Sequence, residues 1–174
     1  MARLAHDRIV RKLDEAEGFL MLEMPQRALE ILQSRPDWAT MRFEASFLAG
    51  EALRGLGRYR EALASLECAA GLRPGHVGVA IALGWCYKRT HRIAQAIDAL
   101  ERARRDAPDE PLLHYNLACY WCLAGNSPRA LQALETALDL DPALQARIAS
   151  EGDFRSLQGN PEFEKLAPGR APSA

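Results

Sequence analysis

The residues with the clearest chemical potential are two cysteines, Cys119 and Cys122, which form a C-x-x-C pair. Residues three apart lie on one face of a helix, so the two sulfurs could bind a metal or form a redox pair. A structural zinc site requires four ligands, and here only Cys86 and His114 could complete it. Redox pairs normally begin a helix, where the helix dipole lowers the thiol pKa, whereas this pair falls in the middle of a predicted helix. The pattern favours packed cysteines, and a metal or redox protein using Cys119 and Cys122 stays an alternative.

No other set of residues predicts catalysis. The four histidines are scattered over predicted turns and helix starts, and none stands at a recognisable spacing from a nucleophile. They are His6, His76, His91 and His114. The sequence contains neither the G-x-x-x-x-G-K-[ST] phosphate loop nor the G-x-S-x-G nucleophile motif. We therefore expect no catalytic residue, no metal ligand set and no cofactor.

Composition narrows the class of protein further. A chain of 174 residues with 48% hydrophobic residues is long enough for one domain with a full core. Its net charge of −1 argues against nucleic acid as a partner, because proteins that bind polyanions are normally basic. No apolar run approaches the roughly 20 residues of a membrane span, and the N-terminal residues lack the apolar stretch of a secretory signal. We therefore expect reduced thiols and a cytoplasmic location.

The elements that position these residues follow a repeat of 34 residues. Five columns of like residues recur at this step. They are Ala16, Gly50, Gly84 and Ala118; Ala28, Ala62, Ala96 and Ala130; Leu32, Leu66, Leu100 and Leu134; Ala69, Ala103 and Ala137; and Pro74, Pro108 and Pro142. A fixed period of this length is typical of a solenoid of stacked helix pairs. We expect the small residues where paired helices cross, the leucines between one repeat and the next, and the prolines after each second helix.

These spacings resemble those of the tetratricopeptide repeat family. In the third repeat, the small pair Leu83-Gly84 is followed by Tyr87 and then by residues of four of the columns. The resemblance implies an all-α fold, a right-handed α-solenoid of about four helix pairs with a C-terminal capping helical segment. We expect a single domain over residues 1–167. Its repeats would cover residues 9–42 (degenerate), 43–76, 77–110 and 111–144, followed by a cap at 145–167 and a disordered tail at 168–174.

Helical periodicity and turn residues give the expected helices. They are 5–23, 26–34, an unusually long helix from Trp38 to Gly55, 60–72, 77–89, 94–106, 111–124 and 128–140. The turn at 125–128 predicts Ser127 as a helix cap. Residues 143–150 form a further predicted helix, and 153–157 and 161–166 form short helical pieces. In these pieces Phe154, Leu157, Phe163 and Leu166 would cover the open end of the core.

The resemblance also implies a concave groove lined by the first helix of each pair. The groove residues carried over from the family are Phe47, Glu51, Arg54, Ile81, Trp85, Lys88, Arg89, Leu112, Tyr115, Asn116, Cys119 and Cys122. We expect Trp85 and Tyr115 to anchor a peptide, because aromatic side chains bring a large contact area at little entropic cost. Lys88 and Arg89 would hold an acidic residue or a C-terminal carboxylate. The alternative is that the superhelix is too short to curve much, and that the C-terminal cap or a second copy covers these residues.

Some family members use basic and asparagine side chains to clamp a chaperone's C-terminal carboxylates. Here the corresponding positions carry Leu13, Glu17, Leu48, Gly78 and Ala82, and only Asn116 fits. This argues against a clamp.

The sequence thus predicts a non-catalytic module that binds a protein or peptide partner. The alternative within the family is a dedicated chaperone for a secreted or assembly-prone client. A homodimer is also possible, formed through exposed Trp38, Phe43 and Phe47.

Overall fold

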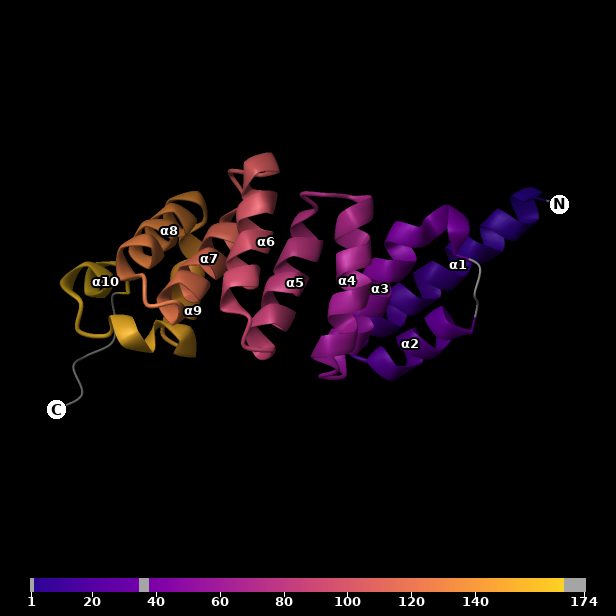
Figure 1. The fold of residues 1–174 in the computed structure, drawn as a ribbon, viewed down its shortest axis with the longest axis horizontal. Helices are drawn as coiled ribbons and strands as arrows, with labels where there is room; N and C mark the ends of the chain where they lie inside the picture. Colours follow the sequence, from indigo (N-terminus) through magenta and orange to yellow (C-terminus); the bar gives the residue numbers. More distant parts are fainter. Residues whose placement is uncertain (1, 35–37, 168–174) are drawn as a thin grey trace.

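A computed structural model describes residues 2–34 and 38–167 of the chain, with side chains described from residue 6 onward. Within these ranges the protein contains helices and turns and no strand. Figure 1 shows helix pairs following one another along the long axis of the molecule. The predicted disordered tail, 168–174, lies outside the described residues.

Four helix pairs make up the body of the molecule. They are α1 (Ala2–Met21) with α2 (Pro25–Gln33), α3 (Arg42–Gly55) with α4 (Tyr59–Leu72), α5 (Val77–Arg89) with α6 (Ile93–Asp106), and α7 (Pro111–Leu123) with α8 (Ser127–Leu140). From α4 to α8 the predicted helix ends agree with the structure to within one residue. The prediction of an all-α solenoid of helix pairs is confirmed.

Small residues stand where the paired helices cross, as predicted. A Cβ atom added to Gly50 would lie 2.5 Å from the Leu66 side chain. One added to Gly84 would lie 2.6 Å from Leu100 Cδ1 and 2.8 Å from Tyr120 Cε2. Real Cβ atoms do not approach other atoms so closely, so each glycine makes room for the leucine of its own pair. Leu66 and Leu100 are fully buried.

The expected long helix from Trp38 is wrong. A short 3₁₀ turn, η1 (Ala39–Met41), comes first, and Met41 leaves helical geometry at φ −131° and ψ 38° before α3 begins. Trp38 is engaged elsewhere, because its indole Nε1 donates to the carbonyl of Leu32 at 2.9 Å. Trp38 thus satisfies one of the free carbonyls at the end of α2.

The turn between α7 and α8 differs from the prediction in one detail. Gly125 has φ +77°, a left-handed conformation that ends a helix readily. The cap of α8 is Asn126, whose side chain accepts from the backbone N–H of Arg129 at 3.2 Å. Ser127, the predicted cap, is instead the first helical residue.

The stack is curved with the first helices on the inside. Helix α1 contacts α3, α3 contacts α5 and α5 contacts α7, whereas the second helices of successive pairs make weaker contact or none in the described part of the chain. Elements on the inner side of a curve lie closer together than those on the outer side. We call the side formed by α3, α5 and α7 the inner face.

The C-terminal segment closes the end of the stack. It consists of η2 (Pro142–Leu144), α9 (Gln145–Ile148), η3 (Gly152–Leu157) and α10 (Pro161–Leu166). The predicted helix at 143–150 is therefore a 3₁₀ turn followed by a single α-helical turn. Helix α10 packs against α8, but η3 packs against α7, so the cap covers part of the inner face as well as the end of the core.

No helix in residues 2–34 and 38–167 is both long enough and apolar enough to cross a membrane.

Candidate functional site

The inner face has an open part on α3 and α5. Its side chains repeat at helical spacing, so they share one face of each helix. We define the open surface as Phe47, Glu51 and Arg54 of α3 with Ile81, Trp85 and Arg89 of α5. Trp85 is 40% exposed, which is unusual for so large an apolar side chain, and Arg89 is also exposed. The other four residues are half-buried.

Cations lie beside the aromatic rings of this surface. The Lys88 ammonium lies 5.3 Å from the centre of the Trp85 ring. The Arg89 guanidinium lies at the same distance from the ring of Tyr59, which begins α4. Such cation–π contacts hold long basic side chains in place without neutralising them. Arg89 forms no ion pair within the described residues, so its charge is available to a partner.

The two charged residues that α3 contributes to the open surface form an ion pair with each other. Arg54 donates two hydrogen bonds to the carboxylate of Glu51, at 2.9 Å and 2.7 Å. These bonds raise the pKa of Arg54 above its ordinary value. The pair contributes polar edges to the open surface but no net charge.

Phe47 is held in an aromatic group at the start of the surface. Its ring centre lies 6.1 Å from that of Phe43 and 5.5 Å from that of His76. Phe43 is buried, and the Arg73 guanidinium covers it at 3.9 Å while pairing with Glu44 at 2.6 Å. The predicted dimer face of exposed aromatic residues is therefore wrong for Phe43, which is covered from within its own chain.

The cap closes the remainder of the inner face. Tyr115, Cys119 and Cys122 of α7 are only 2%, 3% and 4% exposed. The ring of Phe154 in η3 meets that of Tyr115 edge-on, with centres 5.7 Å apart. While the cap is in place these three residues are buried and are not available as groove contacts, which differs from the prediction.

Three further groove predictions concern residues engaged within the chain. Lys88 forms an ion pair with Asp153 of the cap. Asn116 donates from Nδ2 to the carbonyl of Leu112 at 2.7 Å, so its amide is used inside α7. Leu112 itself is half-buried. The 34-residue columns gave no signal for Glu151 and Asp153, because the cap lies outside the repeat.

Burial works against a nucleophilic role for two of the thiols. Burial raises the pKa of the Cys86 thiol to about 11 and that of Cys119 further above the ordinary value. Nucleophilic thiols need the opposite shift. The Cys122 sulfur lies 3.0 Å from the Ser156 hydroxyl, a hydrogen-bond distance that ties α7 to the cap. Cys119 lies near Glu151 and Asp153, and this group could hold a metal.

Two histidines have structural roles. His76 caps α5, since its Nδ1 accepts from the backbone N–H of Val79 at 3.3 Å. His114 is buried, and its Nε2 lies 2.7 Å from the carbonyl of Pro108.

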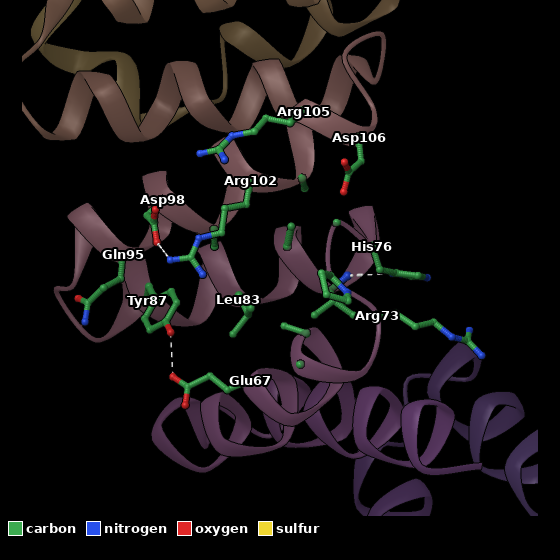
Figure 2. Close-up of a pocket in the computed structure, with 18 residues that line it drawn as sticks. Glu67, Arg73, His76, Leu83, Tyr87, Gln95, Asp98, Arg102, Arg105 and Asp106 are labelled. Atoms are coloured by element: carbon green, nitrogen blue, oxygen red, sulfur yellow. Dashed lines mark hydrogen bonds and ion pairs between the residues drawn. The ribbon is translucent and has the colours of Figure 1, made fainter. Parts of the chain in front are cut away.

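The outer side carries a cleft of about 730 Å³ between α4 and α6. Figure 2 shows Leu83 within this cleft and charged side chains around it. Arg102 pairs with Asp98, and the Tyr87 hydroxyl donates to Glu67 at 2.8 Å. Three arginines and three carboxylates line the cleft, so its charge is balanced; they are Arg73, Arg102, Arg105, Glu67, Asp98 and Asp106. The cleft follows from the curvature that spreads the outer helices apart.

One protein-family model matches part of the chain. Residues 53–118 match the family model described as Tetratricopeptide repeat. No curated protein sequence matches the chain.

Several solved structures share the fold. One is MamA, residues 41 to the end, from Desulfovibrio magneticus RS-1, with 22% identity, 92% of this chain and 93% of that chain covered, and a TM-score of 0.69. MamA of AMB-1 gives 20% identity, coverage of 92% and 91%, and a TM-score of 0.70. TTC0263 of Thermus thermophilus, a thermophilic protein of the same repeat class, gives 19% identity, coverage of 91% and 87%, and a TM-score of 0.71.

Proposed function

This chain carries tetratricopeptide repeats, and on that premise we propose that it is a non-catalytic module that binds a segment of a partner protein on the open surface. The repeat fold and its resemblance to the MamA structures support a protein-interaction scaffold. A stack of helix pairs presents a continuous inner face, and this geometry suits an extended or helical segment.

Trp85 is the observation that carries this proposal. An indole 40% exposed on the inner face leaves a large apolar area in water. Tryptophan is among the residues that contribute most to binding energy when a partner covers them. Lys88 on one side and the cap beyond it bound the surface, so the partner segment has a defined place to lie.

The charges around Trp85 define the chemistry of the segment. Lys88 is already neutralised by Asp153, whereas Arg89 is exposed and unpaired within the described residues. A segment with an apolar side chain over Trp85 and a carboxylate near Arg89 would satisfy both. Charge-assisted hydrogen bonds from a guanidinium to a carboxylate are stronger than neutral ones, so Arg89 would set the preference for an acidic group.

The open surface offers little for catalysis. Its one carboxylate, Glu51, accepts two hydrogen bonds from Arg54. A general base must reach a substrate proton, and this carboxylate is engaged by its neighbour. The surface is therefore better suited to binding than to chemistry.

A displayed library of random peptides tests the proposal. The full chain should enrich peptides that combine an apolar and an acidic residue, and Trp85→Ala should lose them. Leu72→Ala is the matched control, because Leu72 is 42% exposed and belongs to the outer helix α4. Equal enrichment by wild type and Trp85→Ala, or loss with Leu72→Ala, would place binding elsewhere and overturn the proposal.

A further inference from the structure

Three side chains that can bind metals meet where the cap joins α7. They are Cys119 in the middle of α7, and Glu151 and Asp153 on either side of Gly152. The Cys119 sulfur and one carboxylate oxygen of each acid all lie within 4.8 Å of one another. The thiol is buried and both carboxylates are half-buried. The group thus combines one sulfur and two oxygens from two segments that are distant in sequence.

The Cys119 thiol has no hydrogen-bond partner among the described residues. It is 3% exposed and makes no hydrogen bond within the described residues, although two carboxylates lie nearby. Tyr115, one helical turn earlier on the same face, also has a buried hydroxyl without a hydrogen-bond partner there. Buried polar groups are normally satisfied, so two unpartnered ones at one place call for an explanation.

The charges at this junction leave one acid without an ion pair. Lys88 pairs with Asp153, and Arg147 lies over the Tyr115 ring at 5.2 Å. Glu151 accepts a hydrogen bond from the backbone N–H of Asp153 at 3.2 Å but forms no ion pair within the described residues. A cation placed between the thiol and the two acids would meet a partly uncompensated negative charge.

We propose that Cys119, Glu151 and Asp153 bind a zinc ion that fastens the cap to α7. Zinc accepts thiolate and carboxylate ligands in tetrahedral geometry, and a water molecule would supply the fourth ligand beside the three from the protein. The thiolate selects against magnesium and calcium, which require oxygen ligands. With bonds of about 2.0–2.3 Å, the ligand atoms would lie roughly 3.5 Å apart. Zinc binding would therefore draw the ligand atoms together from separations of up to 4.8 Å.

The protons balance in a simple way. The Cys119 thiol loses its proton as the zinc–sulfur bond forms, and that proton leaves to solvent. The two carboxylates bind in their ordinary ionised form, and the Lys88 ammonium keeps its protons while donating a hydrogen bond to Asp153. One proton is therefore released for each zinc ion bound, and binding strengthens as the pH rises.

The surrounding hydrogen bonds support this arrangement. The Lys88 ammonium and the backbone N–H of Asp153 hold the two carboxylates that would face the metal. Partners of this kind orient metal ligands in known sites, and their loss typically weakens binding by about 10–100-fold.

Cobalt binding to the full-length chain tests the proposal, because Co²⁺ replaces zinc and gives a thiolate charge-transfer band in the near ultraviolet. We expect one Co²⁺ per chain, one proton released, and displacement by zinc. Cys119→Ser should lose the band. Cys122→Ser and Cys68→Ser, which change thiols outside the group, should keep it.

Two carboxylate variants separate ligation from cap stability. Asp153→Asn and Glu151→Gln should each weaken binding by more than the roughly 10–100-fold of an outer-shell change. Lys88→Gln breaks the same ion pair as Asp153→Asn but leaves the three ligands, so it should retain the band. The proposal is overturned by a wild-type chain without the band, by a band that depends on Cys122 instead of Cys119, or by Lys88→Gln losing binding as fully as Asp153→Asn.

Discussion

Lys88 of α5 and Asp153 of η3 form an ion pair between residues 65 positions apart in the chain. Their side chains are only 20% and 12% exposed. Because Asp153 lies in the cap and Lys88 lies in α5, the first helix of the pair before α7, the ion pair shows that η3 crosses α7 and reaches α5. The cap therefore divides the inner face into a closed part over α7 and an open part over α3 and α5.

Breaking this ion pair should loosen the cap. Lys88→Met leaves the Asp153 carboxylate mostly buried without its cation, and we expect a loss of up to about 3 kcal/mol in the free energy of unfolding, the lower end for a buried pair. Urea unfolding measures the loss, and limited proteolysis should cut first within residues 149–160. Arg102→Gln is the control, because its pair with Asp98 is 68% and 55% exposed and should contribute less than about 1 kcal/mol. Equal effects of the two variants would contradict the structural role given to Lys88.

Gly84 should tolerate no side chain. In Gly84→Ala the new methyl group would meet Leu100 and Tyr120 below van der Waals distance, and overpacking of this kind costs about 1–3 kcal/mol. Gly18→Ala should instead increase the free energy of unfolding. Nothing lies within 4 Å of the new Cβ, and alanine is favoured over glycine within helices by about 0.5–1 kcal/mol. Thermal unfolding of the two variants, each compared with wild type, checks both predictions. Stabilisation by Gly84→Ala would show that the helices do not cross there.

Stability should fall at high pH through Tyr87. Burial, and then the hydrogen bond to Glu67, raise the pKa of Tyr87 from 10.0 to about 12. The folded state therefore keeps this proton after the unfolded state has lost it. The contribution of Tyr87 is complete below pH 10 and decreases by up to about 1.4 kcal/mol per pH unit as the pH rises to about 12.

The difference between wild type and Tyr87→Phe isolates this effect. We expect wild-type stability relative to the variant to decrease between about pH 10 and pH 12 in urea unfolding experiments. A constant difference would mean that the Tyr87 hydroxyl titrates alike in the folded and unfolded states.

The repeat could be predicted from the sequence because its contacts are periodic. Gly84 and Leu100 belong to columns of like residues that recur every 34 residues. The residues of each column pack within one helix pair or between neighbouring helix pairs. The repeat pattern places the start of α3 too early, at Trp38. The indole of Trp38 hydrogen-bonds to a carbonyl at the end of α2, and none of the five columns includes this contact. The position of η3 could not be predicted for the same reason. Asp153 pairs with a helix 65 positions away, and Tyr115 was expected in the groove because only the cap decides whether it is exposed.

The most direct test of the central claim is the affinity of a selected peptide for three versions of the chain, measured by isothermal titration calorimetry. The account predicts that Trp85→Ala loses at least about 2 kcal/mol of binding free energy, as expected for a residue that dominates an interface, while Leu72→Ala binds like wild type. Full affinity in Trp85→Ala would contradict the assignment of the open surface on α3 and α5 as the partner site.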